Sequence, residues 1–70
     1  MHYDDIVKAV KARRESLRVT QETLAILSGV GLRTLKQFES GKGNPTLLTL
    51  QKVGGALGLE VKVAVKATPS

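Results

Sequence analysis

Apolar side chains in the first part of the chain recur three or four residues apart, which is the spacing of positions on one face of an α-helix. The residues with this spacing are Ile6, Val7, Val10, Arg14 and Leu17. Asp4 and Asp5 stand where the first turn of such a helix favours negative charge, so the pattern predicts a helix from Asp4 to Leu17. Arg14 falls near the apolar stripe, and a charge placed there needs a partner.

A shorter helix and a tight turn are predicted next. Thr20 is a good N-cap, because its hydroxyl can accept a hydrogen bond from an amide of the first turn. The apolar run from Leu24 to Leu27 is expected to supply the buried side of this helix. Gly29 suits the left-handed position just past a helix C-terminus, and Val30 offers an apolar side chain that fixes the turn to the core.

A third helix is predicted from Leu32 to Ser40, with Gly41 ending it. Leu35 and Phe38 lie three residues apart and should face inward. The polar residues of this helix are left on the outward face: Arg33, Thr34, Lys36 and Gln37. The two short helices and the turn between them therefore form a helix-turn-helix pattern.

A fourth helix begins after Thr46, another good N-cap, and ends before Gly58. Its apolar positions are Leu47, Leu48, Leu50, Val53 and Leu57. Gly54 and Gly55 inside it each cost about 0.8 to 1 kcal/mol relative to alanine. We expect a neighbouring helix to approach closely at these glycines, and an intrinsically weak helix is the alternative.

From Leu59 the period changes from that of a helix to that of a strand. The alternating apolar residues of this predicted strand, residues 59–66, are Leu59, Val61, Val63 and Val65. The sequence offers no second strand, so the expected partner is the same strand of a second copy, antiparallel about a twofold axis. A frayed tail or a strand lying on its own domain is the alternative. Residues 67–70, which include Pro69, are expected to form a disordered end.

Composition narrows the chemistry that such a domain can perform. The chain has 70 residues, with 11 Lys and Arg against 6 Asp and Glu, a formal net charge of +5 and no cysteine. Its single histidine is His2, and no set of nucleophile, base and acid can be assembled around it. We therefore expect neither an enzyme nor a metal or other cofactor. The positive charge favours a polyanionic partner.

Two further features concern the partner and the location. Aromatic side chains are limited to Tyr3 and Phe38, which disfavours the stacking platforms that hold single strands and leaves duplex DNA as the better polyanion. No stretch reaches the roughly 18 to 20 apolar residues of a membrane span, and the N-terminal residues do not resemble a signal peptide. We expect no membrane association and a cytoplasmic, nucleoid-associated protein.

The outward face of the third helix carries the candidate base-reading residues. A recognition helix enters the major groove with its first turns at the base edges. Arg33 can pair bidentately with guanine, and Gln37, one turn later, with adenine. Leu32 or the methyl group of Thr34 can contact a thymine methyl group. An ordinary amphipathic helix with a polar face is the alternative for the same residues.

Candidate phosphate contacts flank this helix. Gln21 combines an amide side chain with the N-terminus of the second helix. In the loop of Lys42, Gly43 and Asn44, one cation and backbone amides unhindered by side chains can hold a phosphate. A plain connecting loop is the alternative there. Lys36 is expected to contact phosphate or solvent rather than a base.

Three motifs at their present spacings make the central region similar to a known family. They are T-Q-E-x-L-A at residues 20–25, F-E-x-G-K at residues 38–42 and N-P-T-L-x-T-L at residues 44–50. Over about residues 6–58, the chain resembles the lambda-repressor-like helix-turn-helix domain of the Cro/C1, or xenobiotic-response-element (XRE), family.

This resemblance implies a structural role for two residues and shows two departures. In the family the arginine of the first helix commonly pairs with the glutamate that ends the third, which implies a clamp between Arg14 and Glu39. The resemblance also supports the roles assigned above to Gln21, Arg33 and Gln37. Gly31 stands where the family usually has a capping serine or threonine, and Leu32 stands where a polar base-reading residue is frequent.

A helix-turn-helix domain followed by a strand is similar to HipB-type antitoxins, whose C-terminal strands join across a dimer. Such antitoxins bind a HipA-type kinase toxin and repress their own operon. The prediction is thus a mainly α fold, a four-helix lambda-repressor-like domain at residues 1–58, then one β-strand at residues 59–66 that pairs across a homodimer. The expected function is sequence-specific repression at a palindromic double-stranded DNA operator, with a HipA-like kinase toxin as a further partner. A module that neutralises a partner toxin or enzyme without a DNA role is the alternative.

Overall fold

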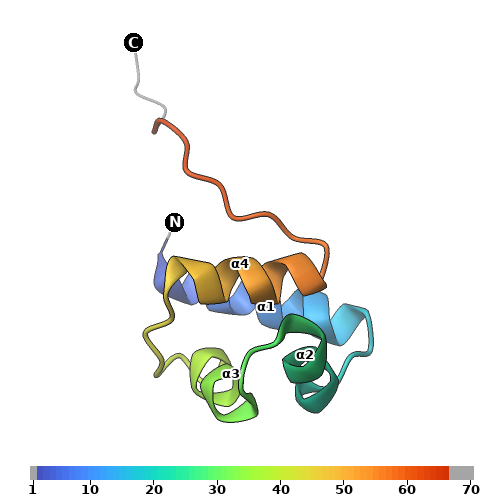
Figure 1. Cartoon of the computed structure of the whole chain (residues 1–70). Helices are drawn as coiled ribbons and strands as arrows, with labels where there is room; N and C mark the ends of the chain where they lie inside the picture. The colour runs from blue at the N-terminus through green and yellow to red at the C-terminus, as the bar shows by residue number, and fades with distance from the viewer. Residues whose placement is uncertain (1, 67–70) are drawn as a thin grey trace.

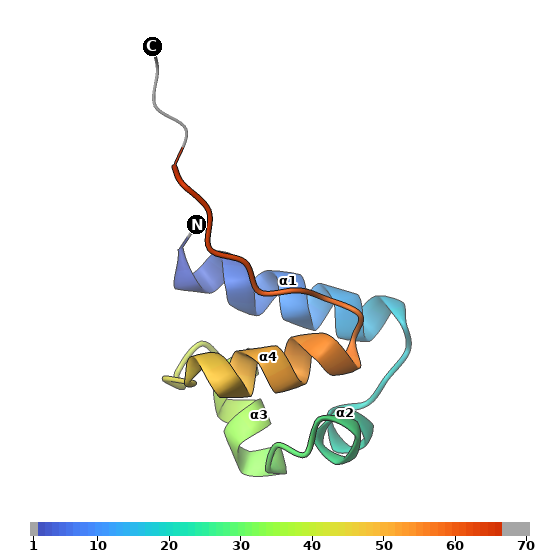
Figure 2. The same cartoon turned by 45° about the horizontal axis from the view of Figure 1, so that its top comes forward.

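A computed structural model describes residues 2–66 of the chain, and within that range four α-helices enclose one hydrophobic core. The helices are α1 (Tyr3–Ser16), α2 (Gln21–Ser28), α3 (Leu32–Glu39) and α4 (Leu47–Ala56). Helices α1 and α4 lie side by side, and α2 and α3 form the opposite side of the molecule (Figure 1, Figure 2). The mainly helical, four-helix domain expected from the sequence is confirmed, and α1, α3 and α4 begin and end within one residue of their predicted bounds.

Every helix contributes to the core. The buried apolar residues are Val7 and Val10 of α1, Leu24 of α2, Val30 of the turn, Leu35 and Phe38 of α3, and Val53 and Leu57 at the C-terminal end of α4. Tight packing of such side chains is the main stabilising contribution in a small domain. The helix-turn-helix pair is therefore held in place by α1 and α4 rather than by its own contacts alone.

The predicted caps and the predicted turn residue are confirmed. The hydroxyl of Thr20 accepts a hydrogen bond from the amide of Thr23 at 3.0 Å, and that of Thr46 accepts from the amide of Thr49 at 3.1 Å. Gly29 has a φ of +72°, and its amide donates to the carbonyl of Ala25 at 3.0 Å. The sharp turn between α2 and α3 thus uses the left-handed conformation that glycine adopts without steric cost.

The prediction that the whole apolar run of α2 is buried is wrong. Leu24 is fully buried, but the side chains of Ile26 and Leu27 are 82% and 61% exposed. Four consecutive residues point in all directions around a helix, since each step turns by about 100°. Only the direction that faces α3 and α4 is covered, and Ile26 and Leu27 point elsewhere.

The surroundings of the two glycines of α4 differ, and the close approach of a neighbouring helix that the sequence had led us to expect occurs at neither glycine. A Cβ added at Gly54 would lie 3.5 Å from the carbonyl oxygen of Leu59, and the amide of Leu59 donates to the carbonyl of Gly54 at 2.8 Å. The element that packs on Gly54 is therefore the segment after α4, not a neighbouring helix. Nothing lies within 4 Å of a Cβ built at Gly55.

Residues 59–66, the C-terminal arm, form no strand in the described monomer, contrary to the sequence prediction. The arm leaves the end of α4, runs back over α1 and α4, and then extends beyond the helices (Figure 1, Figure 2). A strand needs a hydrogen-bonded neighbour, and the single chain described here supplies none. Val63 and Val65 are 95% and 98% exposed. The end predicted as disordered, residues 67–70, lies outside the described residues.

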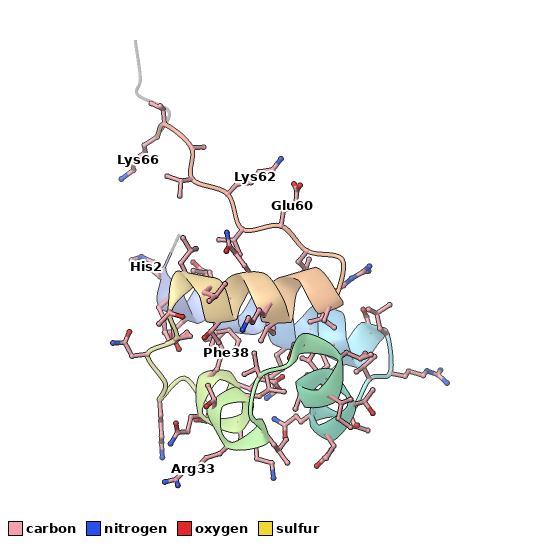
Figure 3. The ribbon with its side chains drawn as sticks, viewed as in Figure 1. His2, Arg33, Phe38, Glu60, Lys62 and Lys66 are labelled. Carbon is pink, nitrogen blue, oxygen red and sulfur yellow. The ribbon has the colours of Figure 1, made fainter. Side chains whose placement is uncertain are left out.

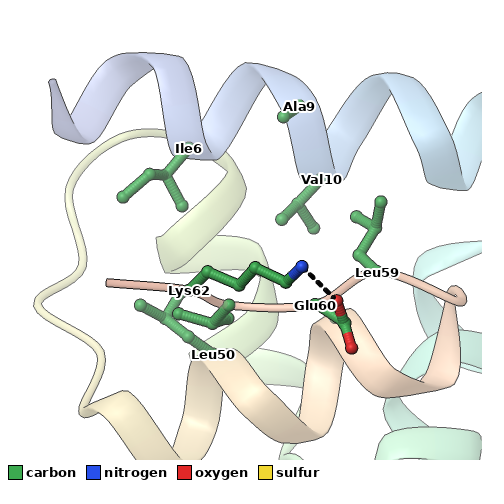
Figure 4. Close-up of a pocket in the computed structure, with 9 residues that line it drawn as sticks. Ile6, Ala9, Val10, Leu50, Leu59, Glu60 and Lys62 are labelled. Carbon is green, nitrogen blue, oxygen red and sulfur yellow. Dashed lines mark ion pairs between the residues drawn. The ribbon is translucent and has the colours of Figure 1, made fainter. Parts of the chain in front are cut away.

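The first residues of the arm help to enclose a largely apolar cavity of about 400 Å³ between α1 and α4. Its lining includes Ile6 and Val10 of α1, Leu50 of α4 and Leu59 of the arm (Figure 4). An ion pair between Lys62 and Glu60, with 3.2 Å between nitrogen and oxygen, lies at the cavity. The arm lies on the side of the molecule away from α3 (Figure 1).

Candidate nucleic-acid interface

Helix α3 divides into a buried face and an exposed polar face. Leu35, Phe38 and Glu39 are buried against the other helices. The exposed residues are Arg33, Thr34, Lys36 and Gln37, and Leu32 is half-buried at the helix start. Figure 3 shows Arg33 directed away from the body and Phe38 directed into it. The polar residues predicted to face outward therefore do so, and they form one continuous surface.

Beneath this surface, Arg14 of α1 holds the end of α3 through a bidentate ion pair with Glu39. Arg14 Nε lies 2.8 Å from Glu39 Oε2, and Arg14 Nη2 lies 2.8 Å from Glu39 Oε1. Arg14 Nη1 also donates to the carbonyl of Val19 at 2.8 Å, which ties the α1–α2 connection to the same group. This is the pairing that the family resemblance implied for these two residues. It also explains why an arginine can lie near the apolar stripe of α1.

The ion pair places two opposite charges side by side inside the protein. The side chain of Glu39 is only 2% exposed. Hydrogen bonding to the Glu39 carboxylate raises the pKa of the Arg14 guanidinium above its ordinary value. Burial of a lone carboxylate would be costly, whereas paired and fully hydrogen-bonded charges are tolerated. A bidentate pair of guanidinium and carboxylate forms in one relative orientation only. The pair of Arg14 and Glu39 therefore fixes the orientation of α3 relative to α1.

Gln21 stands in the first turn of α2, as predicted, and its side chain makes a contact that the sequence did not indicate. It is half-buried, and its Nε2 donates to Glu39 Oε1 at 3.2 Å. The side-chain amide therefore joins the pair below α3 and connects α2 to it. Sequence reasoning missed this contact, because nothing in the spacing of residues 21 and 39 indicates that they meet.

In the loop after α3, two of the backbone amides proposed as phosphate donors already donate within the chain. The amides of Lys42 and Gly43 both donate to the carbonyl of Gln37, each at 3.1 Å, and so complete the end of α3. The idea of free amides at these two positions is wrong for this reason. The side chains of Lys42 and Asn44 remain exposed and available to a partner.

The exposed charges of this region have one sign. Between Leu32 and Asn44 the single acidic residue is Glu39, which is buried and paired. The remaining charged residues, Arg33, Lys36 and Lys42, are exposed and positive. A surface of this kind attracts a polyanion. In the described part of the chain, no cluster of acidic or histidine side chains is arranged to hold a metal ion.

None of the helices described in residues 2–66 has the length and apolar character needed to span a membrane. Each has 14 residues or fewer.

Comparison with known proteins gives consistent results. Residues 10–63 match the helix-turn-helix family model HTH_3. The chain is 38% identical over 56 residues to the immunity repressor protein of Bacillus phage phi105, covering 80% of this chain and 39% of that protein. It is 35% identical over 49 residues to the cryptic phage CTXphi transcriptional repressor RstR of Vibrio cholerae serotype O1, covering 70% of this chain and 44% of that protein.

The chain thus spans about two fifths of the length of these curated relatives. The matched region contains both helices of the motif, the turn, α4 and the start of the C-terminal arm. The chain therefore belongs to the XRE-type helix-turn-helix family.

Proposed function

We propose that this chain binds duplex DNA sequence-specifically through α3 and acts as a transcriptional repressor. The observation that carries the proposal is the exposed polar face of α3 above a buried clamp. Two similar phage proteins that are named as repressors support it. A fixed helix is needed because base-edge recognition depends on side chains held in register with the groove.

In this proposal, the residues of α3 have separate tasks. Arg33 donates two hydrogen bonds to guanine O6 and N7, and Gln37 pairs with adenine N6 and N7. Thr34 contributes its methyl group to a thymine contact, and half-buried Leu32 contributes only the exposed part of its side chain. Each bidentate pair is worth roughly 1 to 3 kcal/mol of discrimination against a wrong base.

Backbone contacts in the proposal come from residues around α3. Lys36, Lys42 and Asn44 reach phosphates through their exposed side chains. The N-terminus of α2 beside Gln21 offers a further phosphate position, even though the Gln21 amide donates to Glu39. These contacts fix the register of α3 and carry no sequence information.

We further propose that the repressor is a homodimer on an inverted-repeat operator, with half-sites about one helical turn apart or somewhat more. The support is the C-terminal arm, whose Val63 and Val65 are almost fully exposed. Pairing of two arms, antiparallel about a twofold axis, would satisfy their backbone groups and cover these valines. The arm lies on the side away from α3, so this pairing leaves the DNA face free.

The test is Arg33→Ala against a duplex selected from a random pool by the wild-type protein. We expect the variant to lose its preference for the selected duplex while keeping weak, salt-sensitive binding, as measured by fluorescence anisotropy. Lys36→Ala is the matched control, because loss of a phosphate contact weakens binding to all sequences alike and reduces the salt slope by about 0.9. Unchanged preference in Arg33→Ala would contradict the assignment of α3.

A protein-interaction module that neutralises a toxin, such as a HipA-like kinase, or another enzyme is the competing function. It is favoured by the exposed arm, which presents apolar side chains to a partner protein. Neutralising several phosphates gives a steep salt dependence of affinity, with a slope of about −0.9 per phosphate. Duplex affinity that barely changes with salt would therefore favour the interaction module over the repressor.

A further inference from the structure

The side chain of Tyr3 makes contacts that the functions above do not use. Tyr3 begins α1, and its hydroxyl donates to the carbonyl oxygen of Gly43 at 2.8 Å, across 40 positions of the sequence. Its ring meets the ring of Phe38 edge on, with centroids 6.2 Å apart and planes at 87°. Phe38 belongs to the buried face of α3. One side chain therefore connects the start of α1 to the core of α3 and to the loop that follows α3.

Gly43 is held at both of its backbone polar groups. Its amide donates to the carbonyl of Gln37, and its carbonyl accepts from Tyr3. A Cβ at this position would lie 3.1 Å from the amide nitrogen of Phe38 and 3.2 Å from its Cα, tighter than ordinary van der Waals contact. Gly43 thus packs directly on the last turn of α3, in a place where a larger residue would push the loop away.

We propose that Tyr3 is a positioning residue for the DNA-backbone contact made by this loop. Tyr3 fixes the Gly43 peptide, and the two exposed side chains on either side, Lys42 and Asn44, are thereby presented to a phosphate in a set direction. Ordering the loop before DNA arrives reduces the conformational entropy lost on binding. This proposal rests on the proposed DNA-binding function, and Tyr3 itself touches no DNA in it.

The test is Tyr3→Phe, which removes the hydroxyl and keeps the ring against Phe38. We expect affinity for the selected duplex to fall about two- to tenfold, the factor that one net hydrogen bond gives. We also expect the slope of log affinity against log salt to become less steep by about 0.9, because one phosphate contact is lost. Ser16→Ala is the matched control, since it removes an exposed hydroxyl that donates to the carbonyl of Arg13 at the other end of α1.

A purely structural role would lower stability without changing the salt slope, so the slope distinguishes the two. In addition, adding Tyr3→Phe to a variant with both Lys42→Ala and Asn44→Ala should weaken binding no further, because all of these changes remove the same loop contact. An unchanged salt slope in Tyr3→Phe, or full addition of the two losses, would overturn the proposal.

Hydrogen exchange in the DNA-free protein separates this proposal from the proposed function. We expect the amides of Lys42 and Gly43 to exchange faster in Tyr3→Phe than in wild type or Ser16→Ala, relative to the amides of α1. If the wild-type protein selects no duplex, the DNA-binding function fails, and the exchange rates alone then decide whether Tyr3 orders the loop. Unchanged rates would refute that ordering.

Discussion

The helical body and the C-terminal arm both have regularly spaced apolar residues, but the body buries a core of them and the end of the arm buries none. In the body, Leu24 and Leu35 are inaccessible to solvent, whereas Val63 and Val65 of the arm are 95% and 98% exposed. The body supplies a complementary surface within one chain. Leu59 at the start of the arm packs against the core, but the described part of the arm that carries Val63 and Val65 has no such surface. A periodic pattern therefore predicts which residues share a face, and it predicts burial only where a partner surface lies within reach.

The same difference separates the two ion pairs of the molecule's described part. The pair of Arg14 and Glu39 is nearly buried and bidentate, while Lys62 and Glu60 in the arm are 77% and 76% exposed. Exposed pairs contribute little because water and salt screen them. Breaking a buried pair leaves one charge without a partner in a medium that solvates it poorly. The two ion pairs should therefore differ greatly in their contribution to the stability of the protein.

The largest expected effect is that of Arg14→Met, which should lower the free energy of unfolding by about 3 to 5 kcal/mol. The cause is the Glu39 carboxylate, which stays buried without its guanidinium. Lys62→Met in the arm is the control and should change stability by no more than about 0.5 kcal/mol. Urea unfolding followed by circular dichroism measures both.

Arg14→Lys should destabilise this small domain less than Arg14→Met does, because lysine keeps the positive charge and loses only the bidentate geometry. The free energy of unfolding of Arg14→Lys should lie between those of wild type and Arg14→Met. The comparison of the two pairs would break down if Arg14→Met and Lys62→Met were equally stable.

A smaller but still large effect is expected inside α2. Leu24→Ala should cost about 2 to 5 kcal/mol, because it removes a fully buried side chain and leaves a cavity. Ile26→Ala, two residues later, should change stability by no more than about 0.5 kcal/mol, because Ile26 is 82% exposed. Equal losses from the two variants would show that α2 packs on a further surface in solution. Thermal unfolding of both variants makes the comparison.

Local signals predicted most of the body correctly. Thr20 and Thr46 cap their helices, and Gly29 adopts the left-handed turn, because these preferences depend on neighbouring residues only. Leu35 and Phe38 are buried, as their spacing on an otherwise polar helix indicated. A helix with one apolar stripe has a single way to face a core.

The errors concern contacts that depend on tertiary structure. The apolar run of α2 surrounds the helix, so the sequence could not show that Ile26 faces solvent. The contacts of Gln21 with Glu39 and of Tyr3 with Gly43 join residues 18 and 40 positions apart. No periodicity encodes such distances. For the interface, the sequence predicted the outward residues of α3. Of the buried groups that fix their direction, it indicated the pair of Arg14 and Glu39 and missed the contact of Gln21 with Glu39.

The arm gives the smallest expected change in the stability of a single chain and a separate change in assembly. Val63→Asp should leave the unfolding free energy of the monomer within about 0.5 kcal/mol of wild type, since its side chain is 95% exposed. If two arms pair, the same variant places a charge on the apolar side of the pairing and should convert dimers to monomers in sedimentation experiments. Operator affinity should fall with it, because one copy reads only one half-site.

Ala64→Asp is the matched control for this experiment, because residue 64 lies on the other side of a strand and would face solvent in the paired arms. It introduces the same charge at the neighbouring position and should leave the dimer intact. Dimers that survive Val63→Asp would show that the arm is not the contact between copies, and self-association would then have to use another surface of the body. Loss of dimers in both variants would point to charge rather than apolar burial as the controlling factor. Loss in Val63→Asp alone would show that the valines of the arm are buried by a second copy, as the leucines of the body are buried within one chain.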